Sequence, residues 1–485
     1  MINDHPFFEH IRAQHPTPEN FDAFLAACNR PLRKSIRVNT LKISVADFRC
    51  IADNHNWLLS PIPWCEEGFW ISAADENELS QLGNCGEHLM GLFYIQEASS
   101  MLPPIALLKD NPSTLVLDVA AAPGSKTTQL AALMDNQGTI LANELSASRL
   151  KVLHANLQRC GVTNTCMGHY DGTQLDKNLI ACFDSILLDA PCGGEGTYRK
   201  DPKALDNWSL SAIESISNLQ KQLLLSAWKM LKPGGRIVYS TCTLSRAENQ
   251  DVIKALKDEV ADELSIIPLK ELFPEASHVV TDEGFIHVWP EVFDCEGFFV
   301  ACLEKKKSNA IAEVSKITSE SPFKRLNNKT SQLIKEYYQQ QFDFDLSPLL
   351  SQLRLRVSQR ENQVWLFPEY GEKLRQSLRL QRSGIRVCDL IDSRKGTIIK
   401  TCHEFVICFG TTFSKQFVEL NATQAVACYK GNNIQDIFST KLTMGEAVMS
   451  YKGVPLGLAK VLNTGSIIKL KNNLPRDLLR TNARF

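Results

Sequence analysis

The sequence lacks the patterns that mark most metal, redox and membrane proteins. None of its 15 cysteines stands three residues from another, so it contains no Cys-x-x-Cys pair of a zinc site or redox dithiol. The first residues are polar, without the apolar core of a signal peptide, and no apolar run approaches the length of a membrane span. We therefore expect no metal, no membrane association, and free thiols in a reducing cytoplasm.

The charge is close to zero for the whole chain and strongly uneven along it. The net charge of the 485 residues is −1. From residue 371 to the last residue, 18 Lys and Arg stand against 8 Asp and Glu, a net charge of +10, and the remainder carries −11. This excess predicts a C-terminal module that binds a polyanion, although a solvated basic surface would give the same composition.

Strand and helix signals alternate through the middle of the chain. Apolar β-forming runs predict strands at 114–119, 138–143, 183–188 and 236–240, with helical patterns at 146–158 and 210–231. Two further runs, 285–289 and 297–303, are expected to form a closing strand pair. Repeated strand–helix units predict an α/β domain with a parallel, doubly wound sheet that has helices on both faces.

Changes in composition divide the chain into four expected parts, with no repeat or low-complexity tract. They are an α+β extension (1–105), the α/β domain (106–305), a polar linker with a small intermediate domain (306–374), and a C-terminal β-barrel (375–485). In the last part, some of the lysines that alternate with apolar positions should share one face; these are Lys452, Lys460, Lys469 and Lys471.

Two of the predicted strands end in turns that contain a cysteine. Strand 183–188 leads into Asp189-Ala190-Pro191-Cys192, and strand 236–240 leads into Thr241-Cys242. Open α/β sheets carry their chemistry at strand ends, so a thiol placed there is a candidate nucleophile. Most of the other cysteines are expected to be buried, inert side chains.

The turn after the first strand of the α/β domain predicts a nucleotide-like ligand. It lacks the Gly-x-Gly-x-x-Gly pattern, which disfavours a nicotinamide cofactor, but its small residues allow close approach to a helix N-terminus. Glu144, twenty residues after Gly124, has the offset of a carboxylate that binds ribose hydroxyls, and Asp171 could accept from an adenine amino group. Each acid alone could be a solvated or capping carboxylate. In order along the chain, they predict an adenosyl ligand. The turn runs through Ala120, Ala121, Ala122, Pro123, Gly124, Ser125 and Lys126.

These segments together resemble the RNA cytosine-5 methyltransferases of the Nol1/Nop2/Sun family. The similarity is carried by 118–126, 189–192 and 240–242, and extends to 37–42 and 94–101. The basic C-terminal region resembles the PUA-type RNA-binding module of bacterial members that act on small-subunit ribosomal RNA. The resemblance implies a Rossmann-like class I methyltransferase sheet with an N-terminal α+β RNA-binding extension and a C-terminal PUA-like β-barrel. It also implies S-adenosyl-L-methionine as cofactor, with contacts at Ala120 to Lys126, Glu144, Asp171 and Asp189.

The chemistry of such enzymes explains why two thiols are needed. A thiolate that adds to carbon 6 of cytosine makes carbon 5 nucleophilic, and a second group must then assist release of the methylated base. In DNA cytosine-5 methyltransferases the Pro-Cys thiol attacks, which would nominate Cys192. The resemblance to the RNA family implies instead that Cys242 attacks and Cys192 assists release. Asp189 would hydrogen-bond to ring nitrogen 3.

The resemblance also implies the partner, a cytosine of 16S ribosomal RNA within the small ribosomal subunit. Transfer RNA is the nearest alternative substrate, and a non-catalytic RNA-binding assembly factor is an alternative of another class. No obligate protein partner is evident. Two basic features near the predicted site have open roles. Lys126 could contact Asp189, position the ligand or face solvent. The segment Arg199-Lys200-Asp201-Pro202 could touch RNA phosphate or cap the start of a helix.

Overall fold

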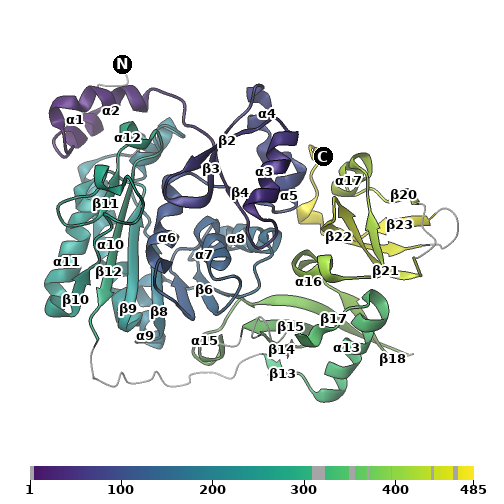
Figure 1. Ribbon diagram of the computed structural model, residues 1–485. Coiled ribbons are helices and arrows are strands. Elements are labelled where there is room, and N and C mark those ends of the chain that lie inside the picture. The colour runs from purple at the N-terminus through teal and green to yellow at the C-terminus, as the bar shows by residue number, and fades with distance from the viewer. Residues whose placement is uncertain are drawn as a thin grey trace.

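The computed structural model describes residues 5–307, 323–348, 355–368, 371–394, 396–437, 442–462 and 468–485. Its centre is a nine-stranded sheet in the order β10-β12-β9-β8-β5-β6-β7-β16, with β11 paired to β12 (Figure 1). The five central strands are parallel: β5 (Leu115–Asp118), β6 (Thr139–Asn143), β7 (Thr165–Gly168), β8 (Phe183–Asp189) and β9 (Leu231–Thr241).

The sheet is mixed, whereas a parallel sheet was expected. The pair predicted at 285–289 and 297–303 is present as β11 (Ile286–Val288) and β12 (Phe298–Lys305), and it is antiparallel. β12 also runs antiparallel to β9, and β10 (Leu264–Ile266) runs antiparallel to β12. β12 lies between β9 and β10 and is antiparallel to both, so β10 keeps the direction of β9 and β12 alone reverses direction at this edge.

Side chains that alternate along the parallel strands bury both faces of the sheet. Leu117 and Leu188 pack toward α9, α10 and α11, whereas Val116 and Leu187 pack toward α6, α7 and α8. The helices are α6 (Leu102–Leu108), α7 (Ser125–Leu133), α8 (Ala147–Cys160), α9 (Asp176–Leu179), α10 (Leu210–Met230) and α11 (Gln250–Val260). Apolar residues on both faces explain why these strands read as continuous hydrophobic runs.

The N-terminal part contains an antiparallel sheet, β2-β3-β1-β4, beside the central domain (Figure 1). Phenylalanines of α1 and α2 pack against Trp289 and Leu244 of the central domain. The elements are α1 (Pro6–Arg12), α2 (Phe21–Cys28), β1 (Ser35–Val38), α3 (Val45–Asn54), β2 (Leu58–Ile62), β3 (Cys65–Ser72), α4 (Glu76–Ser80), α5 (Gly86–Leu89) and β4 (Phe93–Ile95). A loop at 96–101 then leads into α6 and reaches the site described below.

A third sheet spans the boundary that the composition placed between 374 and 375. Its order is β13-β14-β15-β17-β18, so strands from both sides of that boundary form one sheet. Hydrogen bonding between β15 and β17 therefore joins the intermediate segment to the beginning of the expected C-terminal part. The elements are β13 (Lys324–Arg325), α13 (Asn328–Phe342), β14 (Leu355–Arg360), β15 (Gln363–Pro368), α15 (Glu372–Ser377), β17 (Ile385–Ser393), β18 (Gly396–Thr401) and α16 (His403–Phe409).

The last part of the chain forms a curled five-stranded sheet in the order β19-β21-β22-β23-β20. Among the described residues, its edge strands β19 and β20 do not pair with each other, so this sheet does not close on itself. Its elements are β19 (Phe417–Glu419), α17 (Ala422–Tyr429), β20 (Ile434–Ile437), β21 (Gly445–Tyr451), β22 (Val454–Val461) and β23 (Ile468–Asn472). Lys460 of β22 stands opposite Lys471 of β23, and both side chains are exposed.

The C-terminal half is built into the central sheet at β7. The sequence placed the end of that sheet near Leu303, and this was wrong, because β16 (Arg382–Ser383) pairs antiparallel with β7. The Tyr170 hydroxyl donates to the backbone oxygen of Arg379 at 3.1 Å and accepts from its N–H at 2.7 Å. Leu378 and Leu380 belong to the same buried cluster as the sheet residues. The appended strand thus completes the central domain.

Among the helices of the described residues, none combines the length and apolar composition of a bilayer-crossing segment.

This joint predicts a stability effect for a residue far from the catalytic domain in sequence. Leu380 is 4% exposed within the central cluster. We expect Leu380→Ala to lower the free energy of unfolding by about 2–5 kcal/mol, because it leaves a cavity against the sheet. Chemical denaturation measures the change. Leu333→Ala, at a 38% exposed position of α13, is the control and should change it by less than about 0.5 kcal/mol. Equal effects would contradict the shared core.

Candidate active site

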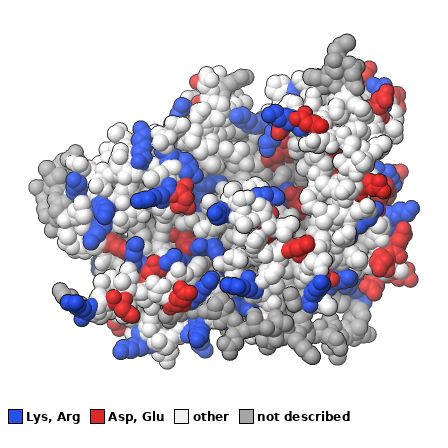
Figure 2. All heavy atoms as spheres, turned by 180° about the vertical axis from the view of Figure 1, so that it is seen from behind, with Lys and Arg blue, Asp and Glu red and all other residues white. Residues whose placement is uncertain are grey.

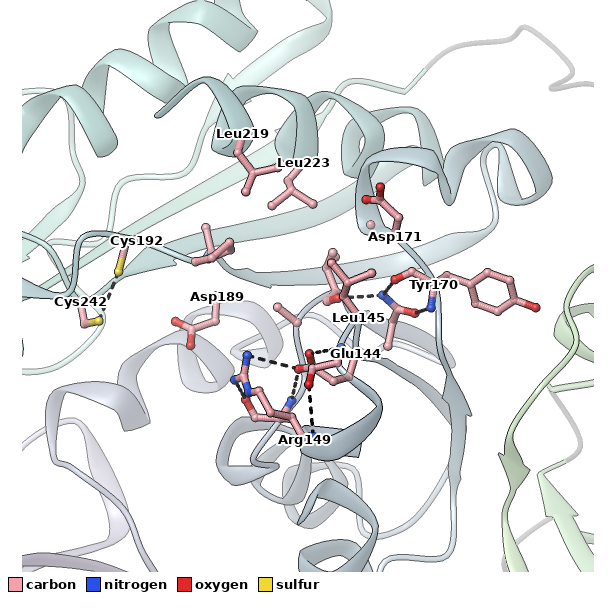
Figure 3. A pocket seen from close by; sticks show the side chains of 18 residues that line it. Glu144, Leu145, Arg149, Tyr170, Asp171, Asp189, Cys192, Leu219, Leu223 and Cys242 are labelled. Carbon is pink, nitrogen blue, oxygen red and sulfur yellow. Dashed lines mark hydrogen bonds and ion pairs between the residues drawn. The ribbon is translucent and has the colours of Figure 1, made fainter. Parts of the chain in front are cut away.

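A pocket of about 470 Å³ opens at the carboxyl ends of the parallel strands. It extends from Cys192 and Cys242 at one end to Tyr170 and Asp171 at the other, with Asp189 between them (Figure 3). Strand ends of an open α/β sheet are the usual place for a ligand, and here four of the five parallel strands lead directly into lining residues. The remaining lining is largely apolar and includes Val119, Leu145, Ala190, Pro191, Leu219 and Leu223.

Glu144 is a buried carboxylate that connects the small-residue turn after β5 to the start of α8 in the wall of the pocket. Its Oε1 accepts from the Ser146 N–H at 2.8 Å, and its Oε2 accepts from the Ala122 N–H at 3.3 Å. Arg149 of α8 approaches Oε2 at 3.6 Å and donates to the Ala122 oxygen at 2.5 Å. The carboxylate therefore ties the small-residue turn to the start of α8. The offset of Glu144 was read from the sequence, whereas Arg149 gave no sequence signal.

Asn143 holds the next two loops in place. Its amide donates to the Val119 oxygen at 3.1 Å and to the Tyr170 oxygen at 2.9 Å, and its side-chain oxygen accepts from the Tyr170 N–H. Asp171 follows immediately, lines the pocket, and caps the next turn by accepting from the Thr173 N–H at 2.9 Å through Oδ1. The Asn143 side chain at the end of β6 thus fixes this end of the pocket by binding backbone groups that follow β5 and β7.

Only part of the small-residue turn lines the pocket. Ala120 and Ala122 are in its wall. Gly124, with φ of +109°, lies at the N-cap of α7 and makes the left-handed turn that L side chains rarely adopt. Ala121, Pro123, Ser125 and Lys126, which the sequence also placed at the ligand, are not among the lining residues.

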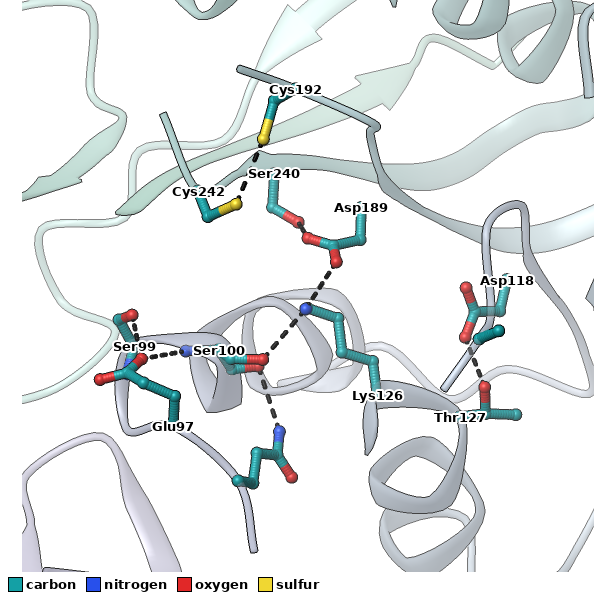
Figure 4. A network of polar contacts seen from close by, with 12 residues as sticks. Glu97, Ser99, Ser100, Asp118, Lys126, Thr127, Asp189, Cys192, Ser240 and Cys242 are labelled. Carbon is teal, nitrogen blue, oxygen red and sulfur yellow. Dashed lines mark hydrogen bonds and ion pairs between the residues drawn. The ribbon is translucent and has the colours of Figure 1, made fainter. Parts of the chain in front are cut away.

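Lys126 and Asp189 form the central ion pair of the site. The Lys126 ammonium lies 2.7 Å from Asp189 Oδ2 and donates to Ser100 Oγ at 3.0 Å (Figure 4). Ser240 donates to the other oxygen of Asp189 at 2.8 Å. Both oxygens of Asp189 are therefore fixed in direction, while its side chain keeps an exposed fraction of 30%. Of the roles considered for Lys126, the structure therefore supports the contact with Asp189.

The two predicted thiols meet beyond this ion pair. The sulfur atoms of Cys192 and Cys242 lie 3.2 Å apart, and both cysteines are free and half-buried (Figure 4). The hydrogen bond to Cys242 and then burial raise the pKa of the Cys192 thiol well above its ordinary value. The raised pKa favours the protonated form of Cys192. Because a thiolate is the reactive form of cysteine, a raised pKa disfavours Cys192 as a nucleophile.

The Arg199 side chain is buried and does not face the solvent, where it could contact RNA. Its guanidinium is buried and pairs with Asp294 Oδ1 at 2.7 Å, and it also donates to backbone oxygens of Pro31 and Cys295. The prediction that Arg199 contacts RNA phosphate was therefore wrong, because these partners occupy its donors. Among the described residues, no group of three or more His, Cys, Asp or Glu side chains is arranged to hold a metal ion.

Sequence reasoning missed the contribution of the N-terminal loop. Ser100 contacts Lys126, and Glu97 accepts from the N–H groups of Ser99 and Ser100 at 2.7 and 3.2 Å. These polar residues lie beneath the ion pair (Figure 4). The motif at 94–101 was noted, but nothing in its spacing assigned a role to its serines. The site thus draws on two regions of the chain.

The sheet order and the strand-end pocket define the architecture of a methyltransferase. A family model described as 16S rRNA methyltransferase RsmB/F matches residues 105–304, and the model for the N-terminal domain of 16S rRNA methyltransferase RsmF matches residues 4–98. A solved structure, a methyltransferase homolog from Pyrococcus horikoshii, is 36% identical with a TM-score of 0.51, covering 59% of this chain and 91% of that chain.

Relatives match over nearly the whole length of the chain. Ribosomal RNA small subunit methyltransferase F of Psychromonas ingrahamii is 46% identical over 473 residues, covering 97% of this chain and 96% of the relative. The protein of the same name from Vibrio cholerae is 46% identical over 481 residues, covering 99% and 98%. The chain therefore belongs to the 16S rRNA methyltransferase RsmB/F family, as the resemblance had indicated.

Proposed function

We propose that this protein transfers a methyl group from S-adenosyl-L-methionine to carbon 5 of a cytosine in 16S ribosomal RNA. The observation that carries the proposal is the 3.2 Å contact between Cys192 and Cys242, next to the fixed carboxylate of Asp189. Methylation at carbon 5 needs a nucleophile, a group that assists release and a hydrogen-bond partner for the ring. The proposal includes a cytoplasmic location, where ribosomal RNA is found.

The chemistry of the pocket fits S-adenosyl-L-methionine. Its lining includes three carboxylates, Glu144, Asp171 and Asp189, against a single cationic side chain, Arg149. Such a set suits a ligand with ribose hydroxyls, an amino group and a positive sulfonium, and the apolar residues suit its adenine ring. We infer that Glu144 would hold the ribose and Asp171 the adenine. When bound, the cofactor supplies an activated methyl group.

The chain's own residues then divide the work at the base. Cys242 would add to carbon 6, and Asp189 would hold a proton at ring nitrogen 3, which takes up the charge that develops there. Lys126 orients Asp189 through the 2.7 Å contact. After transfer, loss of the carbon 5 proton and departure of Cys242 free the base, and Cys192 would assist this release. The base must first leave its stack, because the pocket lies below the surface of the domain.

The C-terminal part supports RNA as the substrate. Its net charge of +10 contrasts with −11 for the rest of the chain, and on the rear face acidic side chains gather at the edge opposite the C-terminal sheets (Figure 2). We propose that the curled sheet is a PUA-like RNA-binding module. The names of the relatives favour 16S ribosomal RNA over transfer RNA, and the two thiols with Asp189 disfavour a non-catalytic assembly factor. Bisulfite mapping of both RNAs from cells that lack the protein would separate the substrates.

The two cysteines should fail in different ways when substituted. Cys242→Ala should abolish methylation and leave no covalent protein–RNA complex, because it removes the attacking thiol. Cys192→Ala should retain addition and lose release, so a denaturant-stable complex should accumulate. Gel electrophoresis of the protein with RNA and cofactor measures this complex. Cys302→Ala, a buried thiol of β12, is the control and should form no such complex. A stable adduct in the Cys242 variant alone would reverse the assignment.

Removal of the Glu144 carboxylate should weaken cofactor binding. We expect Glu144→Ala to cost roughly 1–3 kcal/mol in the affinity for S-adenosyl-L-methionine, because it removes buried hydrogen bonds. Isothermal calorimetry measures the affinity, with Lys151→Ala at an exposed position of α8 as the control. An unchanged affinity for S-adenosyl-L-methionine in the Glu144 variant would contradict this part of the proposal. Tight binding of a nicotinamide nucleotide to the unsubstituted protein would also contradict it.

The opposed lysines of the curled sheet should contribute to RNA affinity. The double substitution of Lys460 and Lys471 to alanine should weaken RNA binding and lower the slope of log affinity against log salt by roughly 1 for each phosphate that is no longer neutralised. Filter binding at several salt concentrations measures both. Lys254→Ala with Lys257→Ala, exposed on α11, removes the same charge elsewhere. Identical slopes for the two double variants would mean that the module's lysines merely face water.

A further inference from the structure

Two buried glutamates lie behind the cysteine pair and are used by none of the steps above. Glu195 and Glu248 have exposed fractions of 1% and 0%. They come from two 3-10 turns, Glu195–Thr197 and Arg246–Glu248, that follow the two cysteines in the chain. Among the ion pairs of the described residues, none includes either carboxylate. Buried acids without a cation are costly, so their placement beside the thiols calls for a role.

Both carboxylates converge on Gly193, the residue after Cys192. A Cβ atom at Gly193 would lie 2.6 Å from Glu195 Oε2 and 3.0 Å from Glu248 Oε1, so a larger residue there would displace a carboxylate. Glu248 Oε2 accepts from the Gly193 N–H at 2.8 Å. The Glu195 Oε2 atom is buried without a hydrogen-bond partner among the described residues, and it faces this turn.

The peptide groups on both sides of Cys192 are clamped by this cluster. Gln220 of α10 donates to the Pro191 oxygen at 2.9 Å and to Glu248 Oε2 at 3.0 Å. The contacts to Pro191 and Gly193 thus fix the backbone before and after the cysteine. Cys192 cannot move away from the negative charge of Glu248 without breaking one of them.

Thr243 contacts both glutamates. Its hydroxyl donates to Glu195 Oε1 and also lies 3.3 Å from Glu248 Oε1. Burial and the charge of Glu248 raise the pKa of Glu195 to about 7, and burial raises the pKa of Glu248. A negative charge on one of these carboxylates thus disfavours ionisation of the other.

We propose that Glu195 and Glu248 are positioning residues that keep Cys192 in its protonated form and thereby assign the attack to Cys242. This inference rests on the proposed function for the meaning of "attack", but the state of the thiols can be measured without RNA. Glu248 is held against the peptide N–H that follows Cys192, so its negative charge would repel a second negative charge on that sulfur. Cys192 is then the donor and Cys242 the acceptor of the contact between the sulfurs.

Other titratable groups near Cys192 act in the same direction. Cys242 faces it from the end of β9, Glu195 and Glu248 from the two turns, and Tyr239 from within β9. Asp189, at the end of β8, is the remaining acid of this group, and its charge is compensated by Lys126 at 2.7 Å. Of the acids near Cys192, the glutamates are thus the uncompensated ones that a single substitution can neutralise.

The order in which the thiols react tests the proposal on the unsubstituted protein. Iodoacetamide alkylates thiolates, and peptide mass spectrometry resolves the individual cysteines. Cys242 should be modified before Cys192 at neutral pH, with no RNA or cofactor present. Modification of Cys192 first would overturn the proposal, and this measurement requires no variant to fold.

Neutralising the glutamates tests the cause. In a chain that carries Cys242→Ser, which removes the coupled titration, Glu248→Gln and Glu195→Gln should each lower the pH midpoint of Cys192 alkylation. Each unit of that shift means a roughly tenfold faster reaction at neutral pH. Glu446→Gln, a half-buried acid of β21, is the matched control and should leave the midpoint unchanged.

Three outcomes are informative. Midpoints of both glutamine variants equal to that of the Glu446 control would overturn the proposal. A variant that fails to fold is recognised because all of its cysteines react together, and the order of reaction in the unsubstituted protein then decides alone. If the thiol order and midpoints behave as expected but no RNA is methylated, the proposed function fails while the assignment of the protonated thiol holds.

Discussion

The in-register parallel pairing of β8 with β9 is the constraint on which the site depends. Asp189 stands opposite Ser240, so the two strands leave the sheet at the same level. Cys192 follows Asp189 after three residues, and Cys242 follows Ser240 after two. A slip of one residue would turn every side chain of one strand to the other face and separate the sulfurs. Because both faces of these strands are buried, such a slip would disrupt the side-chain packing on both sides of the sheet, and this packing helps to fix the 3.2 Å contact.

The same strand ends make the site a property of the whole molecule. Lys126 is held by Asp189 on one side and by Ser100, from the N-terminal loop, on the other. At the far end of the pocket, Tyr170 lines the wall while its hydroxyl binds the backbone of Arg379. The parts that flank the central domain are thus hydrogen-bonded directly to residues at the pocket.

How much the sequence could predict follows from the range of the interactions involved. The central strands and the residues after them were predictable, because a buried strand is a local pattern and parallel strands bring their carboxyl ends together. β16 was not, since a two-residue strand has no pattern of its own and exists only through its pairing with β7. The burial of Arg199 and the convergence of Glu195 and Glu248 on Gly193 also depend on contacts between distant segments. The charges and glycines in the sequence do not by themselves indicate these contacts.

Charge separation along the chain has a consequence for how a polyanion would approach. With −11 on the first 370 residues and +10 on the rest, the electrostatic attraction for a polyanion is strongest toward the C-terminal part. Inside the pocket negative charge prevails, because three carboxylates face one arginine. Under the proposed function, the target base would enter the pocket while its phosphates stay outside, toward the basic residues of the C-terminal part. An acidic pocket suits a cationic cofactor and a neutral base, so the appended sheets rather than the pocket would hold the RNA backbone.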